Sequence, residues 1–402
     1  MSMRTFLTLA LSFAAAGAAF DDDGDSARLP RGGNFTTLVL TPLVIEGLTG
    51  DAAGNLYTTG RQPGNGLPCP VWRISLSSVT PVVVGLVPAP GAASQCSPSG
   101  ITFNAAGALF ISEADKVYRV TPDAASPATA TVYASGVPGT NGLAFDADGN
   151  LWTGDGTTGQ GRVWKIAPSG AVTEMLRIQP MANEVNLVAG IGGIGRDVRS
   201  LAPGAITVTP TSRNAQNLLG SQPLVANGVA FDRRGNLLVA DTARGAIWKV
   251  EFDRQGNVKS PMGCDTTFTP NTLCLSNVLV AHPLLEGADG IALDRAGNIW
   301  ASANERNAVV VVTREDREVV EVFRNPVNAA RLRNEGPLES PTSPFLLGDL
   351  MCTANSDGNR RDNSPSAAGE IGGAGQPRGK ISCLDQRLQV PGLPLPVQRE
   401  HR

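Results

Sequence analysis

The sequence has few aromatic and charged side chains and almost no histidine. Of its 402 residues, 5% are aromatic, 17% are charged and two are histidine. The formal net charge is only −3, and no run of Lys and Arg stands out, which argues against nucleic acid as a partner. There is no Gly-x-Ser-x-Gly motif, and His282 and His401 stand alone, so a serine nucleophile with a histidine base has no support. Many Gly and Pro fit a turn-rich β fold.

Long apolar runs are also missing. A membrane-spanning helix needs about 20 apolar residues, and the longest N-terminal run covers residues 6–16, after Arg4. Small residues follow at 16–19, which predicts a signal peptide over residues 1–19 and an exported protein, periplasmic or extracellular. The alternative is a disordered N-terminus or an anchor. The acidic, Gly-rich residues 20–34 indicate a linker.

Six cysteines are present without a Cys-x-x-Cys motif, which leaves a zinc–thiolate site without support. An even number of cysteines in an exported chain favours disulfides. Proximity in the sequence suggests the pairs 69–96, 264–274 and 352–383, one of fifteen possible connectivities.

One pattern recurs along the chain, in copies that begin at Glu46, Ser99, Asn141, Asn227 and Asp289. Counting that first residue as position +0, every copy has Gly at +1 and +8, Asp or Asn at +5, and an apolar side chain at +10. Positions +2 to +5 alternate as a strand does, and Asp-x-x-Gly-Asn is a tight-turn sequence rather than a calcium loop of EF-hand spacing. Each copy therefore predicts an antiparallel meander.

Strand repeats of about 40–50 residues indicate an all-β fold, a six-bladed β-propeller, over residues 35–390. A weaker sixth copy is placed at Ser340. We expect residues 169–223 to be an insertion in blade three and 391–402 to be a C-terminal tail. A solenoid is the structural alternative. The Gly-x-Gly-x-x-Gly sequence at 190–195 lies in β surroundings and is interpreted as a Gly-rich loop, not as a nucleotide site.

At position +0, four side chains carry oxygens that suit a hard cation: Glu46, Asn141, Asn227 and Asp289. In a propeller the innermost strands line one channel, so side chains at one register lie at one height around it. Carboxylate and amide oxygens together favour Ca²⁺, with Mg²⁺, Mn²⁺ or Zn²⁺ as alternatives. The competing interpretation is that Asn-Gly and Asp-Gly are ordinary turn sequences.

We assign substrate binding to Ser99, which opens the one remaining copy, and to the three acids at +14, which are Glu113, Asp155 and Asp241. The alternative for the three acids is that they are solvated loop residues.

At these residues the chain resembles the senescence marker protein / gluconolactonase / luciferin-regenerating enzyme family (SMP-30/gluconolactonase-like). The resemblance lies in the order Glu-Gly, Asn-Gly, Asn-Gly, Asp-Gly at Glu46, Asn141, Asn227 and Asp289. It implies a six-bladed propeller with one divalent cation on these four residues, and Asp289 as the catalytic acid–base. The family usually has Pro and an aromatic residue after the Glu-Gly, where this chain has Leu48-Thr49.

The resulting hypothesis is a metal-dependent hydrolase of a cyclic ester, with a small-molecule lactone as substrate. The rival hypothesis is a non-catalytic exported propeller that binds or adheres to a partner through a structural cation. A third option, a strictosidine-synthase-like propeller, requires a catalytic Glu for which no clear position is found.

Overall fold

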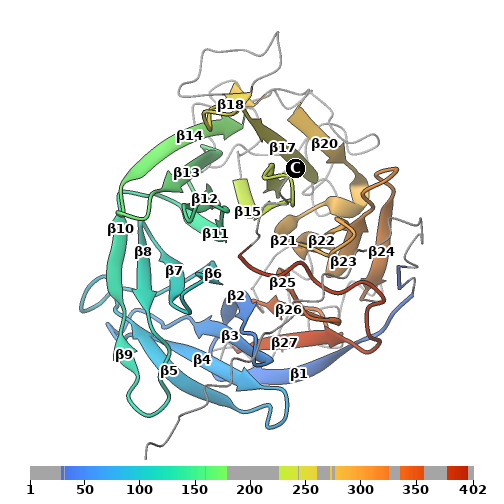
Figure 1. Cartoon of the computed structure of the whole chain (residues 1–402). Coiled ribbons are helices and arrows are strands. Elements are labelled where there is room, and N and C mark those ends of the chain that lie inside the picture. Colours follow the sequence, from blue (N-terminus) through green and yellow to red (C-terminus); the bar gives the residue numbers. More distant parts are fainter. Residues whose placement is uncertain are drawn as a thin grey trace, which may run out of the picture.

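The computed structural model describes residues 29–30, 32–158, 160–178, 226–242, 244–259, 272–273, 277–325, 336–356 and 378–396. The predicted signal peptide, the Gly-rich sequence at 190–195, the suggested Cys264–Cys274 pair and His401 lie outside these ranges. Within them the strands form six sheets arranged around a common axis, which confirms the six-bladed propeller (Figure 1). The described residues contain no helix long and apolar enough to cross a bilayer.

Each blade begins with its innermost strand at the channel and continues outward. The first three blades comprise β2 (Ile45–Gly50), β3 (Asn55–Gly60), β4 (Cys69–Ser75), β5 (Pro81–Val87) and β9 (Ala128–Thr129); β6 (Ile101–Phe103), β7 (Leu109–Glu113), β8 (Lys116–Val120) and β10 (Thr131–Ser135); and β11 (Thr140–Phe145), β12 (Leu151–Asp155), β13 (Arg162–Ile166), β14 (Val172–Ile178) and β19 (Thr272–Leu273).

The other three blades follow the same plan. They comprise β15 (Ala226–Phe231), β16 (Leu237–Asp241), β17 (Ala246–Phe252), β18 (Val258–Lys259) and β20 (Val278–Ala281); β21 (Ala288–Leu293), β22 (Ile299–Ala303), β23 (Ala308–Val312) and β24 (Val319–Arg324); and β25 (Pro341–Leu347), β26 (Leu350–Asn355), β27 (Gly379–Leu384) and β1 (Phe35–Thr41). Among the described residues, the short 3-10 helix η3 (Pro283–Leu285) connects β20 to β21, and η4 (Asn304–Arg306) follows β22.

The ring of blades is closed by the N-terminal strand. β1 pairs antiparallel with β27 and so completes the last blade with residues from the start of the chain. Cys352 and Cys383 face each other across β26 and β27 and form a disulfide, and Cys69 and Cys96 form another. Two of the three suggested pairs are thus confirmed.

The repeated Asp-x-x-Gly-Asn sequences are blade turns, as predicted. In blade one, Asp51 Oδ1 accepts from the backbone N–H groups of Ala53 and Asn55, while its Oδ2 accepts from the Asn55 amide. The glycine at +8 adopts a φ of +86° at Gly54, a conformation that costs glycine little. The Asp51 carboxylate therefore stabilises its own turn, which supports the interpretation of this sequence as a blade turn rather than a calcium loop.

The hydrophobic core is divided among the blade interfaces. Six clusters of buried apolar side chains lie in the described residues, and each joins two neighbouring blades. Trp248, for example, is fully buried between blades three and four. A single meander cannot bury both of its faces, so the blades depend on one another for stability.

Three segment boundaries differ from those predicted. The repeat of blade six starts two residues after the predicted Ser340. Its first two strands are joined by a turn shorter than those of the other blades, since Leu347 pairs with Leu350, and Pro341 pairs with Asn355. Thr342 consequently occupies its position +0. β14 lies inside the expected insertion, so residues 172–178 belong to regular blade three. Residues 391–396 do not leave the fold as a tail: Gly392 and Leu393 donate backbone hydrogen bonds to Gly348 and Leu293.

Candidate functional site

The first residue of each copy and Thr342 lie together in a ring at one end of the channel, which we call the +0 ring. A β-carbon added to a +1 glycine would collide with the +0 carbonyl oxygen of the next blade, at 2.2 Å for Gly47 and Ser99 and at 2.5 Å for Gly228 and Asp289. The same relation joins Gly100 to Asn141, Gly142 to Asn227 and Gly290 to Thr342. Thr342 Oγ1 donates to the Glu46 carbonyl at 2.7 Å and closes the circle.

The repeated glycines explain this close approach. Neighbouring inner strands come so near to one another that no side chain fits at +1, and only glycine permits the contact. The glycine register therefore sets the spacing of the +0 ring. The four proposed metal ligands, each only 4–7% exposed, occupy four of the six places in this ring.

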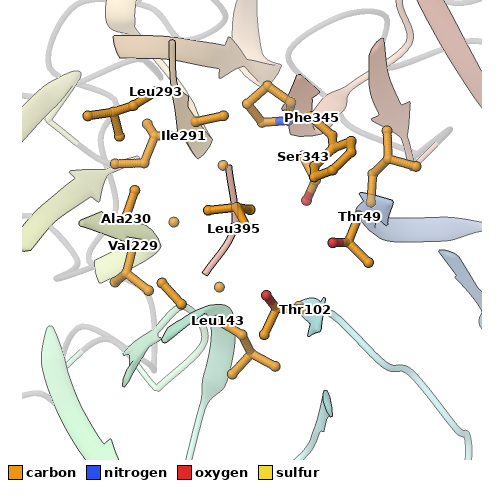
Figure 2. A pocket seen from close by; sticks show the side chains of 18 of the residues that line it. Thr49, Thr102, Leu143, Val229, Ala230, Ile291, Leu293, Ser343, Phe345 and Leu395 are labelled. Atoms are coloured by element: carbon orange, nitrogen blue, oxygen red, sulfur yellow. The ribbon is translucent and has the colours of Figure 1, made fainter. Parts of the chain in front are cut away.

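Below the ring the channel is mostly apolar, with the hydroxyl side chains of Thr49, Thr102 and Ser343 among the aliphatic ones. A cavity of about 100 Å³ is lined by positions +1 to +4 of the inner strands, and the members of the +0 ring are absent from its described lining. Figure 2 shows Leu143, Val229, Ile291 and Phe345 around it, with Leu395 of the C-terminal segment at its centre. Because that segment bonds to Leu293, it enters from the turn end of the blades, so the polar ring is approached from the opposite end.

A second ring supports the first. In three blades the side chain at +15, immediately after the second strand, contacts the +0 side chain of its own blade. Arg61 forms an ion pair with Glu46. Asn227 Nδ2 donates to Thr242 Oγ1 at 3.1 Å, and Asn304 Nδ2 donates to Asp289 Oδ2 at 2.8 Å. In blade three Gly156 takes this position, and a β-carbon there would lie 2.3 Å from Asn141 Nδ2.

The side chains at +15 were missed from sequence, although the register contains them. Sequence alone favours the +14 acids as substrate-binding residues, because they carry charge. Side chains alternate along a strand, so +14 and +15 point to opposite sides, and in these three blades the +15 side chain is the one that contacts the +0 side chain.

The +14 acids Asp155 and Asp241 are internal anchors. Both are fully buried, so the solvated alternative is wrong for them. Asp155 accepts from Arg162 Nε at 3.0 Å and from Thr158. Asp241 Oδ2 accepts from Arg244 at 3.0 Å and from Trp248 Nε1 at 3.1 Å. All of these partners belong to the same blade as the acid they bind, which gives both carboxylates a role in folding the loop after the second strand.

Glu113 differs from the other two acids. It is 3% exposed, and its carboxylate accepts from the backbone N–H of Ser97 at 2.8 Å. Burial raises the pKa of Glu113 to about 7, while the Ser97 N–H and the positive charges of Arg61 and Lys116 act in the opposite direction. Ser99, in the ring itself, is 8% exposed. The Arg61 guanidinium therefore lies close enough to the buried Glu113 carboxyl to act on its pKa.

The donors in the ring suit a hard cation better than a soft one. The described residues contain no group of three or more His, Cys, Asp or Glu side chains that could hold a metal. A cation in the ring would therefore depend on two carboxylates and two amide oxygens, which is chemistry for Ca²⁺, Mg²⁺ or Mn²⁺ rather than Zn²⁺. The Arg61 guanidinium already pairs with Glu46, so a cation there must share or displace that contact.

Comparisons with known proteins agree on the fold. A family model described as the SMP-30/Gluconolactonase/LRE-like region matches residues 186–331, which include Asn227 and Asp289, so the resemblance is confirmed. A search of curated proteins finds no match.

Solved structures with this architecture include a luciferin-regenerating enzyme, 14% identical over 92% of this chain and 100% of that one, with a TM-score of 0.53. The PQQ-bound aldose sugar dehydrogenase of Streptomyces coelicolor is 15% identical over 88% and 99%, also with a TM-score of 0.53. Regucalcin, a calcium-binding protein of Agrobacterium tumefaciens, is 16% identical over 91% and 99%, with a TM-score of 0.47. At such identities the first two establish the propeller fold alone, and the third adds nothing to the argument.

Proposed function

We propose that this propeller, which resembles the SMP-30/gluconolactonase/LRE-like family, is a metal-dependent hydrolase of cyclic esters. The observation that supports this most directly is the +0 ring. It gathers Glu46, Asn141, Asn227 and Asp289, which are far apart in the sequence, at one channel mouth. A bound divalent cation would polarise the lactone carbonyl and stabilise the oxyanion, a contribution of several kcal/mol.

The chain's own residues would perform the remaining tasks. Asp289 is proposed as the general base, and the Asn304 amide fixes its orientation through Oδ2. General acid–base catalysis of this kind contributes about 10²–10⁴-fold. Burial of the +0 ring limits water around the reacting group, and Arg61 offers donors to an oxygen-rich substrate.

Ser99 and Glu113 remain the proposed substrate-binding residues, because Ser99 belongs to the +0 ring and the charge of Arg61 acts on Glu113. Asp155 and Asp241 are withdrawn from that role, since Arg162, Arg244 and Trp248 already bind their buried carboxylates. Export remains a prediction, and the two disulfides fit an oxidising compartment.

The second candidate is a non-catalytic exported propeller, and one observation favours it. Arg61 already supplies a positive charge to Glu46 without a metal. The fold does not decide between the two, because one propeller architecture carries unrelated chemistries, and a PQQ-bound dehydrogenase shares it.

The deciding experiment measures hydrolysis of a panel of lactones by EDTA-treated protein, before and after addition of Ca²⁺, Mg²⁺ or Mn²⁺. We expect hydrolysis to return with the cation and to fall at least about 100-fold in Asp289→Asn. Asp253→Asn, which changes a turn acid of blade four, is the matched control and should retain full activity. Cation binding without turnover of any lactone would favour the binding module.

A further inference from the structure

A cleft between blades four and five is lined by an unusual number of cations. It encloses about 270 Å³ and lies beside the turns, at the end of the blades opposite to the +0 ring. Six cationic and two acidic side chains line it, in a chain whose net charge is −3. The cations are Arg233, Arg234, Lys249, Arg295, Arg314 and Arg317.

No run of basic residues in the sequence reveals this cluster. Arg233 and Arg234 follow Asp232 in the turn between β15 and β16, and Arg295 occupies the equivalent place after Asp294 in blade five. Arg314 and Arg317 belong to the turn between β23 and β24. The propeller places the blade-four and blade-five turns side by side, as the neighbouring positions of β15–β18 and β21–β24 show (Figure 1).

The acids that line the cleft offset its positive charge only in part, although Lys249 also pairs with Glu251. Asp232 accepts hydrogen bonds from Arg234 N and from the backbone and amide of Asn236, all within its own turn. Asp294 is 2% exposed and accepts from Asn298 and from Trp300 Nε1. Within the described ranges, no carboxylate forms an ion pair with Arg234, Arg295, Arg314 or Arg317.

Two of the arginines are held in place by backbone carbonyls. Arg317 Nη1 donates to Leu279 O at 3.5 Å and so connects blade five to blade four, and Arg314 Nη1 donates to Ala296 O at 3.4 Å. The Arg314 stem also packs over Gly297, where a β-carbon would lie 2.9 Å from Cδ. A guanidinium has five N–H donors, so one such contact leaves most donors for a ligand.

Apart from Gly297 and Thr313, the remaining lining of the cleft is aliphatic. Side chains of Leu238, Leu279, Leu293, Ile299 and Leu393 contribute to it, the last from the C-terminal segment. An arginine rim over an aliphatic floor favours a ligand with an anionic head and a short apolar portion, because each part finds a matching surface.

We propose that this cleft binds a small amphiphilic anion, namely a phosphate or sulfate monoester with a short alkyl or aryl group. The ligand's oxygens accept from Arg295 and Arg314, and its apolar portion covers Leu279 and Leu393, which are only partly buried. This site is separate from the +0 ring and does not depend on lactone chemistry.

The test is calorimetric titration of the full chain with octyl phosphate below its micellar concentration and with inorganic phosphate. We expect octyl phosphate to bind one per chain, at least about tenfold more tightly than inorganic phosphate, because its alkyl chain buries CH₂ groups against the aliphatic side chains of the cleft. The double variant Arg295→Gln/Arg314→Gln should bind at least about tenfold more weakly, because it loses two charge-assisted partners. Raising the salt concentration should weaken wild-type binding as well.

Arg254→Gln is the matched control. Arg254 is an exposed arginine of blade four that does not line the cleft. This variant removes one positive charge outside the cleft, whereas the double variant removes two inside it, and it should bind as the wild type does. Equal weakening in the control would reduce the effect to general surface charge and overturn the proposal. So would the absence of wild-type binding, or binding to anionic phosphatidylglycerol vesicles without binding to monomeric octyl phosphate. Circular dichroism of each variant establishes that it is folded.

Discussion

Replacing Arg61 by Gln should make the ring bind a divalent cation more tightly while making the cation-free protein less stable. The Arg61 guanidinium pairs with Glu46, whose side chain is 8% exposed, whereas the Arg61 side chain is 24% exposed. Breaking a buried pair by removing one partner costs about 3–5 kcal/mol. Since Arg61 is partly solvated, we expect a loss of about 2–3 kcal/mol in the free energy of unfolding without metal.

The effect on cation affinity has the opposite sign. Two unit charges about 4 Å apart interact by about 4 kcal/mol at an effective dielectric constant near 20. Solvent access to Arg61 reduces this repulsion, so we expect the cation to bind about 10- to 100-fold more tightly in Arg61→Gln, or about 1.4–2.8 kcal/mol. The stabilisation that saturating cation adds should grow by the same amount.

The measurements are calcium titration calorimetry and urea unfolding with and without calcium. Arg61→Lys is the matched control, because it keeps the charge and should bind calcium within about threefold of the wild type. A folded Arg61→Gln variant whose calcium affinity is unchanged or weaker would show that Glu46 does not contribute to a cation site.

Three further predictions concern the scaffold and the mouth. Gly228→Ala should lower the free energy of unfolding by about 1–3 kcal/mol, because its β-carbon would lie 2.5 Å from the Asp289 carbonyl; Gly107→Asn, with open space around it, should cost under about 1 kcal/mol in the same urea titration. Burial raises the pKa of Glu113 to about 7 from 4.5, so its contribution to stability is complete below pH 4.5 and is lost as the pH rises through 7. Between pH 4.5 and 7 the free energy of unfolding of the wild type should therefore fall by at most about 3 kcal/mol more than that of Glu113→Gln. An identical pH dependence of unfolding in both proteins would refute the raised pKa. The double variant Cys352→Ala/Cys383→Ala removes a disulfide beside the ring closure and should lose about 2–5 kcal/mol in urea unfolding; an unfolding midpoint equal to that of the wild type would show that this bond adds no stability.

The repeat register made the ring predictable from sequence. Gly at +1 and the Asp-x-x-Gly-Asn turn fix both ends of each inner strand, so the first residue of every copy had to reach one end of the channel. The same register located Glu46, Asn141, Asn227 and Asp289. The start of blade six could not be predicted correctly, because its first turn is shorter than those of the other blades. A repeat of constant length gives Ser340 at position +0, where the structure has Thr342.

Other features depend on tertiary contacts that spacing does not encode. Charge alone favours the acids at +14 over the side chains at +15 as site residues. Strand alternation, however, directs Asp155 and Asp241 into the blade. It leaves Arg61, Thr242 and Asn304 beside the ring. The cationic cleft joins turns from two blades, so its arginines look isolated along the chain. Leu395 lies in the channel because the C-terminal segment contacts blade five, and no local sequence pattern predicts that contact (Figure 2).

The +0 ring is proposed to hold one divalent cation. Titration calorimetry of calcium into the EDTA-treated wild type tests it most directly, with Asn227→Ala, Asp289→Asn and the control Asp253→Asn measured alongside. We predict one calcium per chain, at least about tenfold weaker binding in each of the two ring variants, and no change in the control. A wild type that binds no divalent cation, or a one-site isotherm that both ring variants leave unaltered, would contradict it.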